Sequence, residues 1–208
     1  MDASPDGGEV PVLVTDDGEA LFQSDTIMQY IDEAFGERLV KGSPLDKARD
    51  RAWGRLASDN YLTQCATQRS QDETTFTRRL KDLAPIFAAM EERLGAAPYF
   101  HGTEVSAVDI DWLPVLHRSE LIRQHAGYDF FENYPKLQTW RASLLATSLA
   151  ERSVPKDFEE IFTSFYLNEE THLGRLVEGC GESFEPGGGN GGKAALATCC
   201  GGQAGCGS

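Results

Sequence analysis

Residues 10–35 contain the feature that most constrains what this chain can fold into. Two short β-rich runs, Val-Pro-Val-Leu-Val and Glu-Ala-Leu-Phe, flank an Asp17-Gly18 pair. An Asp-Gly pair between two such runs is a strong signal for a β-hairpin, because both residues accept the positive φ angles of tight turns. We therefore predict an antiparallel hairpin near the start of the chain.

The pattern becomes helical directly after the second run. Apolar residues then recur at i, i+3, i+4, i+7 and i+8, which places them on one helix face: Ile27, Tyr30, Ile31, Ala34 and Phe35. Ser24 is predicted to cap this helix, and Gly36 to end it. The junction of strand and helix would then present a hydroxyl and unpaired backbone N–H groups, which together favour an anion.

The Val10-Pro11 strand, the acidic-glycine turn and Gln23-Ser24 at the start of a helix together resemble the glutathione transferase superfamily. They are similar to the second half of its thioredoxin-like domain. The resemblance implies that Pro11 follows a cis peptide bond and that the Val10 backbone pairs with the cysteinyl part of glutathione. It also implies that Gln23 and Ser24 hold the γ-glutamyl end. Taken alone, Val-Pro could be an ordinary edge strand and Ser24 only a cap.

The catalytic Tyr, Ser or Cys of the family lies on a segment that would precede Met1, so we assign no catalytic residue. We expect a truncated form, through an N-terminal fragment or a mis-started reading frame, or a naturally shortened relative. A complete member would transfer glutathione to a small electrophile or exchange thiols with a disulfide substrate. The chain alone is expected to have little such activity. The alternative is a non-catalytic, transferase-shaped interaction module.

The rest of the chain is predicted to be helical up to residue 173. Ser43-Pro44 is a good helix start, and the apolar stripe that follows is Leu45, Ala48, Ala52 and Leu56. A second long helix is expected over residues 72–94, with Pro85 inside it. Ser106 and Asp109 have the spacing of a capping box at the start of another helix.

Two further helices are predicted to begin near Tyr134-Pro135 and near Pro155. The second has apolar residues at helical spacing: Phe158, Ile161, Phe162, Phe165 and Tyr166. This Phe-rich helix and the run over residues 112–118 are most similar to the omega-type and related bacterial cysteine-type members. By the same resemblance, the helices that flank the substrate pocket carry Tyr61, Trp112 and His117, although each could equally be a core residue.

The predicted fold class is therefore α/β, a partial thioredoxin-like β-β-α segment, followed by an all-α helical bundle, and it is mostly helical overall. Residues 1–36 form the predicted glutathione-binding segment, and residues 43–173 form the helical domain. Residues 174–208 are rich in glycine and cysteine, and their composition predicts a flexible tail.

The cysteines and histidines show no metal-ligand spacing. A thiol tail is favoured over a zinc or iron–sulfur site for the cysteines near the C-terminus, which are Cys180, Cys199, Cys200 and Cys206. Cys65 has no obvious basic neighbour and is expected to be an inert thiol. We assign no metal ligand among the histidines, which are His101, His117, His125 and His172.

The net charge of −14 argues against nucleic acid and anionic membranes as partners, since both would repel the chain. No run approaches the ~20 apolar residues that a membrane-spanning helix requires. We expect a cytoplasmic protein. The resemblance adds glutathione as the co-substrate, a small electrophilic or disulfide second substrate, and a homodimer.

Overall fold

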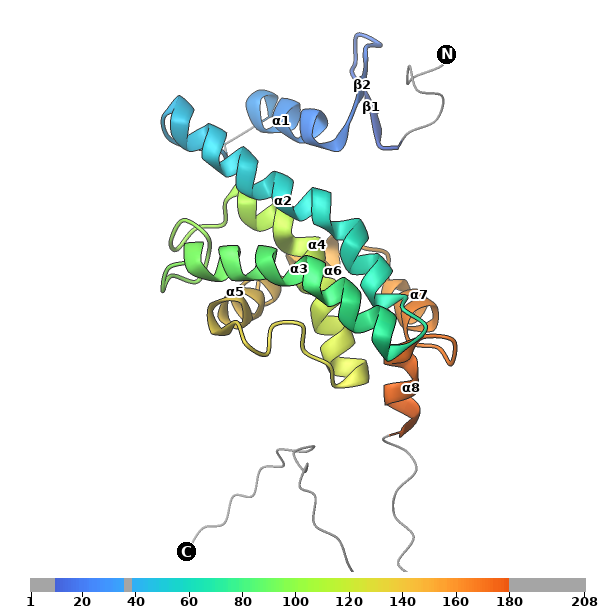
Figure 1. Ribbon diagram of the computed structural model, residues 1–208. Coiled ribbons are helices and arrows are strands. Elements are labelled where there is room, and N and C mark those ends of the chain that lie inside the picture. The colour runs from blue at the N-terminus through green and yellow to red at the C-terminus, as the bar shows by residue number, and fades with distance from the viewer. Residues whose placement is uncertain (1–9, 36–38, 180–208) are drawn as a thin grey trace, which may run out of the picture.

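The computed structural model describes residues 10–35 and 39–179, and it is mostly helical (Figure 1). A small unit comes first, with β1 (Val12–Val14), β2 (Ala20–Phe22) and α1 (Ser24–Ala34). The helical bundle follows, and its elements are α2 (Pro44–Gln68), α3 (Glu73–Arg93), α4 (Ala107–Ala126), α5 (Pro135–Leu145), α6 (Leu149–Arg152), α7 (Phe158–Tyr166) and α8 (His172–Gly179). The predicted fold class, a β-β-α segment ahead of an all-helical domain, is confirmed.

The hairpin forms as the sequence predicts. Strands β1 and β2 are antiparallel, and Val12 pairs with Phe22. The turn is closed by a hydrogen bond from the Gly18 N–H to the Thr15 carbonyl at 2.9 Å. Gly18 has a φ of 84°, a left-handed conformation in which glycine avoids the steric penalty of a Cβ atom. This local chemistry fixes the register of the two strands.

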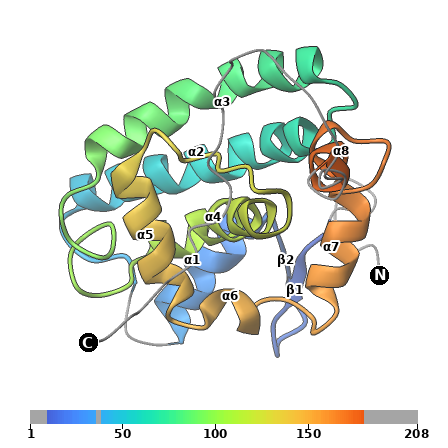
Figure 2. The same ribbon diagram turned by 90° about the horizontal axis from the view of Figure 1, so that it is seen from below.

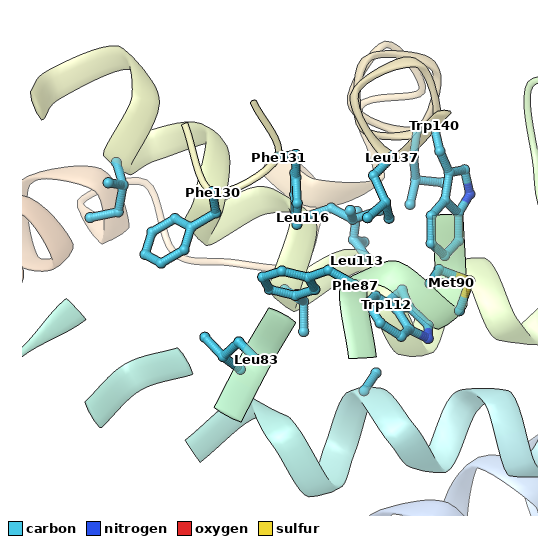
Figure 3. Close-up of a cluster of buried hydrophobic side chains, with 14 of the residues drawn as sticks. Leu83, Phe87, Met90, Trp112, Leu113, Leu116, Phe130, Phe131, Leu137 and Trp140 are labelled. Carbon is cyan, nitrogen blue, oxygen red and sulfur yellow. The ribbon is translucent and has the colours of Figure 1, made fainter. Parts of the chain in front are cut away.

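Helix α4 lies at the centre of the bundle, and Figure 2 shows it nearly end-on with the other helices around it. It packs against α2, α5, α7 and α8. Figure 3 shows the core that results, in which side chains from α3, α4, α5 and the segment before α5 meet: Leu83, Phe87, Met90, Trp112, Leu113, Leu116, Phe130, Phe131, Leu137 and Trp140. Burial of these apolar side chains is the main favourable term in folding of the bundle.

Asp109 connects three parts of the bundle. Its side chain is completely buried. Oδ2 accepts hydrogen bonds from the Ser106 N–H at 2.8 Å and from Ser106 Oγ at 2.6 Å, so the predicted capping box is present. Oδ1 accepts from the Phe100 N–H at 2.9 Å and from Trp140 Nε1 at 2.6 Å. The carboxylate therefore joins the loop before α4, the start of α4 and α5.

The predicted apolar stripe of α2 is wrong. Leu45 is 59% exposed, Ala48 and Ala52 are exposed, and Leu56 is only half-buried. The buried face instead carries small and polar residues, among them Gly54, Ala57 and Gln64. Gln64 Nε2 donates to the Val115 carbonyl at 3.0 Å. Small side chains let α2 approach α4 closely, so contact with α4 decides which face is buried.

Several predicted helix boundaries agree with the structure, and others differ from it. Ser43 caps α2, α3 runs from Glu73 through Pro85 to Arg93, and α5 begins at Pro135. The helix expected near Pro155 begins at Phe158, and two of the five apolar residues that the sequence places at helical spacing are exposed, Ile161 and Phe165.

The predicted tail boundary is also shifted. Helix α8, which the sequence analysis did not predict, continues past residue 173 to Gly179. Gly174 lies within this helix and is buried, so at least residues 174–179 belong to the bundle. Gly36 and the four cysteines of the predicted tail lie outside the described residues.

Candidate functional site

Val10, Pro11, Gln23 and Ser24 lie at the open end of the hairpin. Val12 and Phe22 form the last pair of the sheet on that side, so these four residues follow directly beyond the paired strands, opposite the turn. All four are exposed, and Val10 is 89% exposed. The Val10–Pro11 peptide bond is cis, as the resemblance implied. Sheet pairing thus brings the predicted residues to one end of the small unit.

The start of α1 differs by one residue from the prediction. Gln23, with φ 69° and ψ 117°, is the N-cap, and Ser24 is the first helical residue. The Gln23 carbonyl accepts the first helical hydrogen bond, from the Ile27 N–H at 3.0 Å. The Gln23 side chain makes no capping hydrogen bond to this helix start. Because the first N–H groups of a helix lack partners within the helix, this junction offers donors to an acceptor from outside.

One acidic residue lies beside these donors. Asp25 is in the first turn of α1, where a negative charge is favoured by the helix dipole. The Asp25 carboxylate is also paired with Arg55 of α2, with 3.2 Å between Oδ2 and Nη1. Arg55 also pairs with Asp59 at 2.6 Å, so it offsets the charge of Asp25 only in part.

Tyr61 and His117, two of the three predicted pocket residues, belong to one cluster in the bundle. The Arg118 guanidinium lies 5.8 Å from the Tyr61 ring centre and 4.7 Å from the Phe158 ring centre. The His117 ring stacks on Phe158 with 5.7 Å between their centres. Burial, followed by the positive charge of Arg118, lowers the pKa of His117 to about 4, so its imidazole is neutral near pH 7.

Trp112, the third predicted pocket residue, is a core residue. It is 1% exposed, and its Nε1 donates to the Trp53 carbonyl at 2.9 Å. Its ring packs against Trp140 with 5.7 Å between the centres (Figure 3). Trp112 therefore has no exposed surface to offer a substrate.

The sequence did not predict several members of the Tyr61 cluster. Cys65 is half-buried beside Tyr61 and Tyr166. Burial and the neighbouring Cys65 raise the pKa of Tyr166 well above its ordinary value, and burial raises the pKa of Tyr61. Only the one-turn spacing of Tyr61 and Cys65 was visible in the sequence, since α7 supplies Tyr166 and Phe158 from far along the chain.

Within residues 10–35 and 39–179, no three His, Cys, Asp or Glu side chains are grouped so that they could hold a metal ion. In the same residues, no helix is both long and apolar enough to cross a membrane.

The fold defines a class of protein in which a β-hairpin and one helix precede a helical bundle. The family model described as the C-terminal domain of glutathione S-transferase matches residues 73–143. Glutathione transferase GST 23 of Zea mays is 28% identical over 160 residues, which cover 71% of this chain and 68% of that protein. Glutathione S-transferase omega-1 of Sus scrofa is 28% identical over 141 residues, which cover 66% of this chain and 57% of that protein.

A solved structure agrees with these sequence matches. The glutathione S-transferase of Methylobacillus flagellatus, determined with glutathione bound, superposes with a TM-score of 0.60 and 25% identity. The superposition covers 74% of this chain and 79% of that one. The family model, the relatives and the solved structure together support the glutathione S-transferase superfamily for this chain.

Proposed function

We propose that the open end of the hairpin binds glutathione and that the chain carries the part of a glutathione transferase that holds the peptide portion of this co-substrate. The observation that carries the proposal is the start of α1 beside Pro11, which the Gln23 side chain does not cap. Its exposed Ser24 hydroxyl and first-turn N–H groups are suited to a carboxylate. The glutathione bound to the Methylobacillus flagellatus relative supports this choice of ligand.

The proposed contacts follow from the chemistry of each residue. The γ-glutamyl carboxylate accepts hydrogen bonds from Ser24 and from the N–H groups of the first helical turn, where the positive end of the helix dipole also attracts it. The side-chain amide of Gln23 contacts the same end of the tripeptide. The Val10 backbone lies beyond the last pair of the sheet, so it can pair with the extended cysteinyl part of glutathione.

In this proposal, the second substrate is a small electrophile or a disulfide, and the Tyr61 and His117 cluster is the surface it meets. The aromatic rings and the Arg118 guanidinium suit an apolar compound with a polar or anionic group. The residues assigned here position glutathione, and no residue of this chain is assigned to the activation of its thiol. A homodimer, which is typical of the superfamily, is part of the same proposal.

The decisive experiment is calorimetric titration of the chain with glutathione at pH 7.5. Ser24→Ala should weaken binding about tenfold, because a hydrogen bond to a charged group is worth about 1.5 kcal/mol or more. Ser58→Ala is the matched control, since Ser58 is exposed on α2 and is not among the residues assigned to glutathione. The Ser58→Ala variant should bind as the parent chain does.

Two results would contradict the proposal. A folded chain that shows no heat of binding with millimolar glutathione would favour the alternative, a non-catalytic interaction module. Equal affinities of the Ser24→Ala variant and the parent chain would show that glutathione binds elsewhere.

A further inference from the structure

A cavity of about 420 Å³ lies between α1 and α2 and is separate from the residues assigned to glutathione. Ala107 and Asp111 of α4 complete its lining. None of Val10, Pro11, Gln23 and Ser24 contributes to it. Its volume is within the range of small-molecule sites in proteins, about 300–1,000 Å³. Figure 1 shows α1 and the N-terminal part of α2 on either side of this region.

The carboxylate of Asp111 lies against the backbone of α2 in this cavity. Gly54 leaves the room for it, since a Cβ atom at position 54 would be 1.9 Å from Asp111 Oδ2. No hydrogen bond or ion pair to Asp111 is found among the described residues. Burial raises the pKa of Asp111 to about 6, and the negative charge of Asp25 adds to this effect. Such a carboxylate is stabilised by any cation that reaches it.

The other charges around the cavity also favour a cation. Five of the lining residues are acidic and three are basic. Of the basic ones, Arg55 is already paired with Asp25 and Asp59, at 3.2 and 2.6 Å. Lys47 and Arg51 lie on the part of α2 before Gly54, toward its N-terminus, and Arg51 is exposed. No basic residue of the lining forms an ion pair with the Asp111 carboxylate in the described part of the chain.

The remaining lining is largely apolar, and it contains Met28, Leu39, Val40, Ala52 and Ala107. A ligand that fits this lining has an apolar body as well as a charged group. An inorganic cation would gain nothing from these side chains, whereas an amine with a hydrocarbon chain would bury apolar surface against them.

We propose that the cavity between α1 and α2 binds a small organic cation, with an ammonium group paired with Asp111 and an apolar body packed against Met28 and Ala107. This site does not depend on the proposed glutathione site. It assigns a role to a carboxylate that the transferase reaction does not use.

The pH dependence of binding follows from the charges that face Asp111. The charged residues that line the cavity with Asp111 are Asp25, Asp32 and Glu33 from α1, and Lys47, Asp50, Arg51 and Arg55 from α2. The ammonium group pairs with the ionised form of Asp111, so affinity should be full above pH 7. It should fall as the pH drops through about 6, where the proton returns to the carboxyl group.

The test uses two probes of equal size, 4-phenylbutylammonium and the neutral 4-phenyl-1-butanol, with the whole chain at pH 7.5. Dissociation constants are measured by titration monitored by NMR. The ammonium probe should bind at least tenfold more tightly than the alcohol. Asp111→Asn keeps the shape of the side chain and should make the two affinities equal. Asp82→Asn, an exposed position on α3, is the control and should preserve the tenfold preference.

A second variant keeps the proposal testable even if Asp111→Asn does not fold. Ala52→Phe places a large side chain in the lining and keeps Asp111 itself, and it should weaken both probes while glutathione affinity is kept. The proposal is overturned if both probes bind the parent chain equally, or if the preference for the ammonium probe persists in Asp111→Asn. It is also overturned if Ala52→Phe leaves the affinity of the ammonium probe unchanged.

Discussion

Side chains of the helical bundle such as Trp112, Leu116 and Phe131 are almost completely buried, whereas Ile27 is the one buried side chain of residues 10–35. The bundle also holds buried charges with full sets of partners. Arg141, for example, makes two hydrogen bonds to Asp129, each at 2.8 Å. The small unit instead exposes apolar residues, including Val14 at 60% and Phe35 at 71%.

This difference implies that the bundle determines the stability of the chain, whereas the small unit serves ligand binding. A two-stranded hairpin is marginal on its own in water, and residues 10–35 add little buried surface to support it. The bundle must therefore supply most of the free energy of folding, while the small unit presents exposed donors at the start of α1. Substitutions in the bundle should change stability, and substitutions at the open end of the hairpin should change binding alone.

The largest effect is expected from Asp109→Ala in the bundle. It removes four hydrogen bonds and leaves the buried Trp140 Nε1 and Phe100 N–H without acceptors. We expect a loss on the order of 4 kcal/mol in the free energy of unfolding, measured by urea denaturation. Asp82→Ala, at an exposed site, should change it by less than about 0.5 kcal/mol. A loss below ~1 kcal/mol for Asp109→Ala would mean that this carboxylate acts only as a cap.

A pair of core truncations compares the two regions directly. Leu116→Ala removes a completely buried side chain and should cost about 3 kcal/mol. Ile27→Ala should cost about 1 kcal/mol, because its surroundings are less completely buried. All three tryptophans lie in the bundle, so their fluorescence reports on it: Trp53, Trp112 and Trp140.

The Ile27→Ala variant should leave the fluorescence midpoint in urea nearly unchanged. Amide exchange in β1, β2 and α1 should become faster, because local opening of this unit needs less free energy. Equal shifts of the fluorescence midpoint in Leu116→Ala and Ile27→Ala would show that the two regions unfold together. That result would contradict the separate stability of the bundle.

A further effect is expected in the pH response of His117. Its pKa is near 4 in the folded chain and near 6.5 when unfolded, so the unfolded chain binds more protons between these values. Its contribution to stability is therefore full above pH 6.5 and is lost as the pH falls toward 4. NMR titration should find that the His117 ring takes up its proton near pH 4.

Asp111 titrates in the same range with the opposite sign. Its raised pKa means that its contribution is present below about pH 4 and is lost as the pH rises through about 6. To remove the contribution of Asp111, the free energy of unfolding should be measured as a function of pH for Asp111→Asn and for the double variant that also carries His117→Phe. The double variant should lose less stability between pH 6.5 and 4, and equal losses would assign the effect to another group.

The elements that the sequence predicted well are those set by local chemistry. The turn at Gly18, the Ser43 cap and the Ser106–Asp109 capping box depend on residues within four positions of each other, so a single sequence reveals them. The cluster of Val10, Pro11, Gln23 and Ser24 at one end of the hairpin follows from the same local pairing.

The features that the sequence did not predict depend on contacts between distant segments. The buried face of α2 is chosen by its close packing on α4 and carries Gly54 and Ala57, whereas periodicity predicted a stripe of Leu45, Ala48, Ala52 and Leu56. Trp112 is buried because α2 and α5 both cover it. The cavity that contains Asp111 exists only because α4 meets α1 and α2, and α4 lies far along the chain from both.

The position of Asp109 has a consequence for how the bundle assembles. Its carboxylate needs donors from the loop at Phe100, from Ser106 and from Trp140 on α5. A partly assembled bundle that lacks any one of them would leave a charge in an apolar interior with too few donors, at a cost of several kcal/mol. Such intermediates are therefore sparsely populated, and these three segments are expected to fold in a single all-or-none step.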